Sequence, residues 1–172
     1  GWKIEKVSDR KVRDEWKPLW GKRAVVEDHF NELVIDLVNP AGQLERMQLV
    51  VRGYNDGFAF CYKIPEGEGE CVNVQSELTA YNFAGDYTAW FYNGENHNIG
   101  PEKLTETDGT RLPVMTVKAG DKHYMAIHEA CLETGAPLVL QSKGGNRSFR
   151  SLPSRPVCRR DIHQPGVSLC MG

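Results

Sequence analysis

His128 and Glu129 stand side by side near the end of the segment HYMAIHEACL (residues 123–132), which otherwise alternates. An imidazole beside a carboxylate can bind a metal ion or transfer protons. A zinc protease needs the pattern H-E-x-x-H on a helix, so that both histidines share one helical face. Here the fourth residue after His128 is Leu132, and the preceding alternation is typical of a strand. The spacing therefore argues against zinc.

The residues alone also allow a simpler interpretation of this pair. A glutamate on an alternating strand most often faces solvent, and His128 would then be a polar residue at a sheet edge. Neighbouring residues of a strand point to opposite faces, so His128 and Glu129 form a poor acid–base pair for one sugar ring.

Aromatic side chains offer a second kind of chemistry, which is stacking on a sugar ring. Trp90, Phe91 and Tyr92 are consecutive, so a strand would point them to alternate faces and the core would take part of them. We keep Trp90 as a candidate for substrate contact. Asp56 and Asp86 lie next to turn glycines, where aspartate side chains commonly cap backbone amides.

Bulk composition excludes several classes of function. The 172 residues are enough for one domain with a real core, and 40% hydrophobic and 26% charged residues are ordinary for a globular protein. A net charge of −2 gives no electrostatic reason to expect nucleic acid or an anionic membrane as a partner. No stretch is long and apolar enough to span a bilayer, and no signal-peptide pattern is present.

The five cysteines form no C-x-x-C pair, so they suit neither a zinc ribbon nor a dense disulfide scaffold. We expect them to be small buried hydrophobic residues, at positions Cys61, Cys71, Cys131, Cys158 and Cys170. A bond between Cys61 and Cys71 across the intervening turn is the alternative.

A period of two runs through most of the chain and predicts β-strands. The predicted strands are 29–38, 44–54, 58–64, 72–83, 87–92, 112–119, 123–132 and 137–142. Turn residues separate them, as in Asn39-Pro40-Ala41-Gly42, Asn55-Asp56-Gly57 and Gly120-Asp121. We expect loops at 65–70 and 93–111, and an irregular or edge segment over 1–30. Short strands with such turns predict an all-β fold, an antiparallel β-sandwich.

Four stretches together resemble the amino-terminal β domain of glycoside hydrolase family 97, whose members are α-glucosidases and α-galactosidases. They are GKRAVVEDHFNELVIDL, MQLVVRGYNDGFAFCYKIP, ELTAYNFAGDYTAWFY and LPVMTVKAGDKHYMAIHEACL. The resemblance covers about residues 16 to 142, in order and at sensible spacing. The Tyr-Asn-Asp-Gly hairpin and the His-Glu-Ala segment are its most specific parts.

This resemblance implies a β-supersandwich similar to that of sugar mutarotases, packed on a catalytic (β/α)₈ barrel that follows it in the chain. It also implies an active-site calcium ion, with Glu129 as the ligand that the β domain donates. The barrel would supply the remaining ligands and the catalytic carboxylates, and an α-linked oligosaccharide would be the substrate. None of the barrel lies within these residues. The family resemblance further implies a periplasmic or secreted location.

Calcium chemistry agrees with that assignment. Calcium takes about six to eight oxygen ligands, so a carboxylate such as Glu129 suits it and the imidazole of His128 does not. One glutamate cannot hold calcium alone, because affinity depends on the number and charge of converging oxygens. We therefore expect Glu129 to be part of a site that another domain completes, with His128 and Trp90 as candidates for substrate contact.

The family pattern ends near Ser142. Residues 143–172 are rich in Arg, Ser and Pro and show no period. We therefore expect a β-sandwich domain over 1–142 and an irregular tail over 143–172. A shifted reading frame over residues 162–172 permits a family-like continuation, and we hypothesise that the tail is out of frame. The sandwich would then be incomplete, and the isolated chain marginally stable or aggregation-prone.

Three functions compete at this point. The leading one is a non-catalytic amino-terminal module of a calcium-dependent α-glycosidase, which buttresses the barrel and supplies Glu129. The second is a free-standing carbohydrate-binding module that uses exposed aromatic residues such as Trp90. The third is a mutarotase-like enzyme, for which His128 and Glu129 are poorly placed.

Overall fold

The computed structural model describes residues 1–42, 44–64, 73–74, 78–92, 98–130, 137–153, 157–158 and 168–171. Every regular element in these ranges is a β-strand, and every strand pair is antiparallel. The predicted all-β antiparallel class is therefore confirmed. The chain forms two compact units, the first from Gly1–Val72 with Ile162–Gly172 and the second from Asn73–Asp161.

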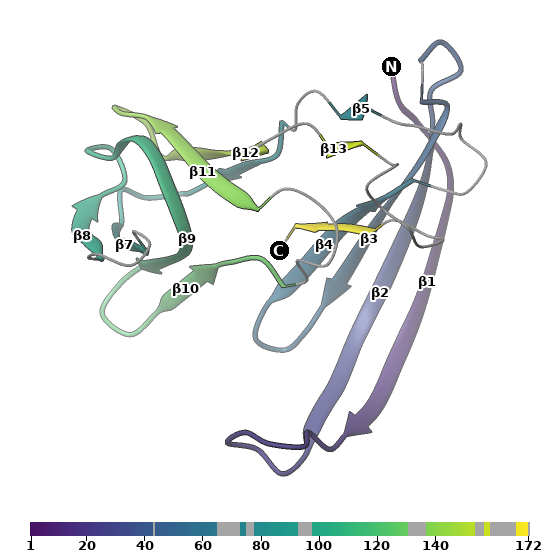
Figure 1. The fold of residues 1–172 in the computed structure, drawn as a ribbon, viewed down its shortest axis with the longest axis horizontal. Helices are drawn as coiled ribbons and strands as arrows, with labels where there is room; N and C mark the ends of the chain where they lie inside the picture. Colours follow the sequence, from purple (N-terminus) through teal and green to yellow (C-terminus); the bar gives the residue numbers. More distant parts are fainter. Residues whose placement is uncertain are drawn as a thin grey trace. The chain divides into compact units, whose positions relative to one another are not determined.

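The first unit is a five-stranded sheet in the order β1-β2-β3-β4-β14 (Figure 1). Its strands are β1 (Lys3–Trp16), β2 (Val26–Val38), β3 (Arg46–Gly53), β4 (Phe58–Lys63) and β14 (Ser168–Met171). The Tyr54 amide donates to the Gly57 carbonyl oxygen at 2.8 Å, which closes the predicted hairpin between β3 and β4.

Of the two alternatives predicted for the amino-terminal stretch, the edge segment is confirmed, because β1 is the edge strand of the sheet. β1 pairs with β2 along its whole length, from Lys3 opposite Val38 to Trp16 opposite Val26. The charged residues that fill β1 hid its period. They also suit an exposed edge, because charges discourage pairing with other chains.

The two faces of this first sheet differ in burial. Phe30 and Glu32 of β2 point to one face with Val50 of β3, and their exposed fractions are 3%, 6% and 4%. Leu33 and Ile35 point to the opposite face and are exposed and half-buried, respectively. The face with the longer apolar run is therefore the less buried one.

The second unit contains a seven-stranded sheet and a two-stranded pair, β5-β13. The sheet follows the order β6-β12-β11-β9-β7-β8, with β10 also paired to β9. The bounds are β5 (Asn73–Val74), β6 (Ala80–Asn82), β7 (Thr88–Tyr92), β8 (Ile99–Lys103), β9 (Asp108–Lys118), β10 (Tyr124–Ile127), β11 (Leu138–Lys143), β12 (Ser148–Pro153) and β13 (Val157–Cys158).

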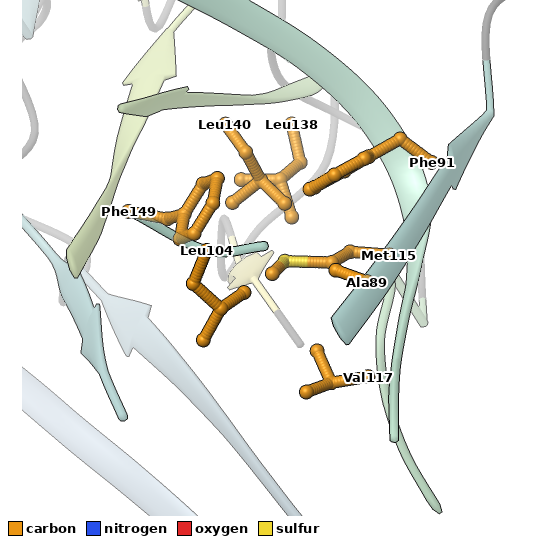
Figure 2. Close-up of a cluster of buried hydrophobic side chains, with 8 residues drawn as sticks. All are labelled: Ala89, Phe91, Leu104, Met115, Val117, Leu138, Leu140 and Phe149. Carbon is orange, nitrogen blue, oxygen red and sulfur yellow. The ribbon is translucent and has the colours of Figure 1, made fainter. Parts of the chain in front are cut away.

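A hydrophobic cluster of buried side chains forms the core of this second unit (Figure 2). Its members come mainly from β7, β9, β11 and β12, and they are Ala89, Phe91, Leu104, Met115, Val117, Leu138, Leu140 and Phe149. Burial of each large side chain contributes about 1.5–3 kcal/mol relative to exposure. This core fixes the positions of β9, β10 and β11, which carry the candidate residues described below.

Two predicted irregular regions contain strands. Residues 93–111, expected as a loop, include β8 and the start of β9, and Leu104 between them is fully buried. The expected irregular tail over 143–172 is wrong for residues 148–153. These residues form β12, which pairs with both β11 and β6 and buries Phe149 in the core. One aromatic residue among Arg and Ser gave too weak a period to detect.

Some expectations fall outside the described residues. These are the loop at 65–70, the positions of Cys71 and Cys131, and part of the strand predicted at 72–83. Cys61 is buried at 8% exposure, as expected for a small hydrophobic residue. None of the described elements is a helix that is long and apolar enough to cross a membrane.

Candidate functional site

The candidate site lies where β10 ends. β9 pairs with β10 through residues 115–118 and with β11 through residues 108–111. Residues 112–114 of β9 pair with neither of these two strands, and Pro113 among them has no amide hydrogen to donate. The end of β10 and the start of β11 therefore need polar groups from elsewhere to satisfy their backbone.

Glu129 supplies one of these groups. It lies two residues after the end of β10, and its Oε2 accepts a hydrogen bond of 3.1 Å from the backbone amide of Leu138, the first residue of β11. The side chain is half-buried, and Leu138 itself belongs to the core. The carboxylate thus joins two strand ends, and a well-packed residue fixes its orientation.

The hydrogen bond from Leu138 leaves coordination capacity on this carboxylate. An ionised carboxylate has two oxygens with about four lone pairs, and the Leu138 amide uses one of them. Oxygen donors of this type are the ligands that calcium prefers. Within the described part of the chain, however, no group of three or more His, Cys, Asp or Glu residues is placed to hold a metal. The Glu129 carboxylate therefore fits a calcium site only as one ligand among several.

His128 is oriented by its neighbour. Its Nδ1 lies 2.9 Å from the backbone carbonyl oxygen of Glu129. A carbonyl oxygen only accepts, so this contact places a hydrogen on Nδ1 and leaves Nε2 as the second nitrogen of the exposed ring. An exposed imidazole held in this way can accept or donate a hydrogen bond to a polar ligand.

Trp90 lies on the face of β7 opposite the core, between the buried residues Ala89 and Phe91. It pairs with Thr116 of β9, which in turn pairs with Ala126 of β10. The side chain is half-buried, and Gly100 of β8 lies close to it. A Cβ at Gly100 would lie only 3.1 Å from the Trp90 Cδ1 atom. Among the described residues, no hydrogen bond or ring contact joins Trp90 to the His128–Glu129 pair.

The structure confirms the predicted backbone cap for Asp86 and the predicted turn for Asp56. Asp86 caps backbone as expected, accepting hydrogen bonds from the Thr105 amide at 3.1 Å and from its hydroxyl at 3.0 Å. These hydrogen bonds, the backbone one first, lower the pKa of the Asp86 carboxyl. Asp56 lies in the confirmed hairpin turn between β3 and β4.

Sequence reasoning missed an ion-pair ladder in the first unit. Arg10, Glu32 and Arg52 are register neighbours on β1, β2 and β3. The buried Glu32 carboxylate accepts from the Arg10 Nε at 2.5 Å and from the Arg52 Nε at 2.7 Å. Arg52 also lies over the ring of Phe30, 4.4 Å from its centroid. The sequence contains no signal for this ladder, because it depends on the register of three strands.

The ladder shifts the protonation equilibrium of Glu32. The hydrogen bond from Arg10 is the largest cause, desolvation opposes it, and the hydrogen bond and charge of Arg52 add to it, so the pKa of Glu32 is lowered. The arrangement neutralises a buried carboxylate with two guanidinium groups. It stabilises the sheet and leaves no reactive group.

A depression of about 600 Å³ also lies on the first sheet, near a bulge in β1. Four of its five polar side chains pair with each other. Arg46 donates to Glu5 at 3.1 Å, and Gln48 donates to Asp36 at 2.7 Å. This depression contains none of the residues predicted for the site.

Comparisons with known proteins agree with the fold. The family model described as "Glycosyl-hydrolase 97 N-terminal" matches residues 1–156. A curated relative, the "Probable retaining alpha-galactosidase" of Streptomyces bingchenggensis (strain BCW-1), is 31% identical over 71% of this chain. The match covers only 16% of that relative, so this chain spans about a sixth of its length.

Solved structures give the same result. A glycoside hydrolase family 97 enzyme from Pseudoalteromonas sp. strain K8, in complex with acarbose, matches 98% of this chain at 23% identity and a TM-score of 0.82. A beta-arabinopyranosidase matches 98% at 16% identity and a TM-score of 0.77. The matched regions are 27% and 30% of those chains. At these identities the likeness shows the fold, and it confirms the predicted antiparallel β-sandwich class.

Proposed function

The chain belongs to the glycosyl-hydrolase 97 N-terminal family, and from this premise we propose that it is a non-catalytic module of a calcium-dependent α-glycosidase. Its proposed partner is a catalytic (β/α)₈ barrel of the same parent enzyme, and the substrate is an α-linked oligosaccharide. The chain buttresses the barrel and donates the Glu129 carboxylate to a calcium ion that both domains bind. The location that goes with this role is periplasmic or secreted.

One observation carries the proposal beyond family membership. The Glu129 carboxylate is fixed at the end of a strand by the Leu138 amide, and it retains lone pairs for a further partner. A fixed carboxylate binds a cation with a smaller loss of side-chain entropy than a mobile one. A calcium ligand donated across a domain boundary would need this kind of support.

The role of the chain's own residues follows from this arrangement. Bound calcium would supply Lewis-acid and orienting chemistry beside the paired carboxylates that glycoside hydrolysis uses. Glu129 would hold one side of the ion while Leu138 keeps the carboxylate in place. His128 would present Nε2 to the sugar, and Trp90 would offer an aromatic surface.

Activity measurements test the proposal. We expect the chain alone to hydrolyse no α-glucoside or α-galactoside, and its assembly with the proposed catalytic barrel to hydrolyse one of them only with calcium. Glu129→Gln should lower the activity of the assembly at least about tenfold, because a ligand charge is lost. The matched control Glu106→Gln changes an exposed glutamate of the same unit and should have no effect. An assembly that keeps full activity in E129Q would refute the proposed role of Glu129.

A second function is favoured by the aromatic residues on the outer face of the second sheet. Tyr92 and Tyr124 are 47% and 61% exposed, and Trp90 shares their face. A free-standing carbohydrate-binding module would use such residues for stacking. Calorimetric titration of the isolated chain with maltose separates the two functions, because only the second one predicts binding by the chain alone.

A further inference from the structure

The carboxyl-terminal strand of the first unit brings two cysteines to neighbouring positions. β14 pairs with β4 in an antiparallel arrangement, and Cys170 is the register partner of Cys61 (Figure 1). Both strands belong to the first compact unit, so the pairing lies within one unit. The two cysteines are roughly a hundred residues apart in the sequence, and only the fold makes them neighbours.

Directly opposite residues of an antiparallel pair have the spacing that a disulfide needs. Their Cα atoms are about 4.5–5.5 Å apart, depending on whether the two residues exchange backbone hydrogen bonds. Disulfides span Cα separations of about 4.4–6.8 Å. Residues at such positions also share one face of the sheet, so a bond between Cys61 and Cys170 needs no change in the register of β4 and β14.

Cys61 lies on the more buried face of the first sheet. Its register partner on the other side is Val50 of β3, and Cys61 and Val50 are 8% and 4% exposed. Of the two residues opposite Cys61 in the sheet, Cys170 is therefore the one that carries sulfur. A disulfide at a buried position is shielded from thiols in solution, whereas exposed disulfides are the ones that are easily reduced.

A nearby cysteine differs in its register partner. Cys158 of β13 lies opposite Asn73 of β5, in the second unit. The pairing of two cysteines is therefore a property of the β4–β14 register and not of the carboxyl-terminal region as a whole. Cys158 provides a matched control for Cys170.

We propose that Cys61 and Cys170 form a disulfide that fastens β14 to β4. A small disulfide such as glutathione disulfide is the oxidant. One cysteine thiolate attacks a sulfur of glutathione disulfide and releases a glutathione thiolate. The second cysteine thiolate then attacks the protein sulfur of the mixed disulfide, which forms the Cys61–Cys170 bond and releases the second glutathione. Two electrons thus pass from the protein to glutathione disulfide, and the two thiol protons end on the two glutathione molecules.

The bond has a defined effect on the chain. It closes a loop of roughly a hundred residues, and a cross-link over such a long loop strongly restricts the unfolded chain. It also keeps β14 on β4, whose backbone groups would otherwise form the unpaired edge of the sheet. The two cysteines lie in the first unit and Glu129 in the second, so the inference goes beyond the proposed function and does not depend on it.

Peptide mapping under two redox conditions tests the bond. The full chain of 172 residues is equilibrated either with an excess of glutathione disulfide or with glutathione alone, alkylated, and digested with trypsin. Each cysteine falls in a separate tryptic peptide, because a cleavable Lys or Arg lies between any two of them. We expect peptides 53–63 and 161–172 to be linked in the oxidising buffer, and the chain to be monomeric in size-exclusion chromatography.

Melting temperatures show whether the bond stabilises the chain. We expect oxidation to raise the melting temperature of the wild type and of Cys158→Ser by at least about 5 °C, and that of Cys170→Ser by less than about 1 °C. Comparing each variant with itself in the two buffers removes the cost of the substitution. The inference would be overturned by a link from peptide 53–63 to any other peptide, by unreacted thiols at 61 and 170 in the oxidising buffer, by a covalent dimer, or by an equal rise in C170S.

Discussion

At the scale of single residues, the carboxylate of Glu129 has two oxygens, and Leu138 uses one of them. The same side chain therefore accepts the hydrogen bond from Leu138 and, in the proposed function, binds a cation. Substitutions can separate these two roles. Glutamine keeps a side-chain oxygen that can accept from Leu138, whereas alanine removes it.

Glu129→Ala should destabilise the isolated chain by about 1–2 kcal/mol, because the backbone amide of the buried Leu138 would lose its acceptor. Glu129→Gln should cost less than half of that. Urea denaturation at pH 7 measures both differences. Equal stability of E129A and the wild type would mean that Leu138 does not fix the carboxylate.

Glu32 gives the isolated chain a pH dependence of stability. Its pKa is lowered in the folded state, so its contribution is present above the ordinary value near 4.3 and is lost as the pH falls from there toward the folded value. Glu32→Gln should lower the free energy of unfolding by about 2 kcal/mol at pH 7.

The difference between E32Q and the wild type should shrink below about pH 4. Urea denaturation at pH 7 and pH 3.5 measures it, with Glu15→Gln as a control at an exposed position of β1. A difference that is the same at both pH values would contradict the lowered pKa.

At the scale of elements, the turns could be predicted from the sequence, but which face of each strand is buried could not. Asn39-Pro40-Ala41-Gly42 closes as a turn, with the Gly42 amide 2.9 Å from the Asn39 carbonyl oxygen. Such residues encode local backbone geometry, which needs no knowledge of the rest of the fold. The apolar alternation of β2 correctly indicated a strand. It could not reveal that the face of Phe30 and Glu32 is the buried one, because that depends on distant strands.

The same reasoning explains the candidate site. The sequence predicted a strand over 123–132 that would contain Glu129. In the structure β10 ends at Ile127, so His128 and Glu129 lie beyond the strand, and the expectation that a strand points them to opposite faces does not apply. The hydrogen bond to Leu138 was not predictable, because nine residues separate the two positions and only the pairing of β9 with both β10 and β11 places them together.

β12 tests how far the folded core extends along the sequence. Phe149→Ala should lower the free energy of unfolding by about 3–5 kcal/mol, because a fully buried ring leaves a cavity. Arg150→Ala, at the next and exposed position, should change it by less than about 0.5 kcal/mol. Thermal melting of both variants checks this. If F149A and R150A melted at the same temperature, Phe149 would not belong to the core, and the prediction of an irregular tail would hold for these residues.

At the scale of the whole molecule, the chain belongs to the glycosyl-hydrolase 97 N-terminal family, and it spans 16% of a curated relative and 27% of a solved family 97 enzyme. The fold class and the family were within reach of the sequence, because turn chemistry and four motifs carry them. Which face of the first sheet is the more buried one was not, since alternating residues fit either face of a strand. A reading frame shifted over residues 162–172 stays a prediction that sequencing the parent gene decides.

Calorimetric titration with calcium tests the central claim most directly. We predict no binding heat from the chain alone up to about 1 mM calcium, binding by its assembly with the proposed catalytic barrel, and at least about tenfold weaker binding by the E129Q assembly. Equal calcium affinity of the E129Q and wild-type assemblies would contradict the claim that Glu129 completes a shared site.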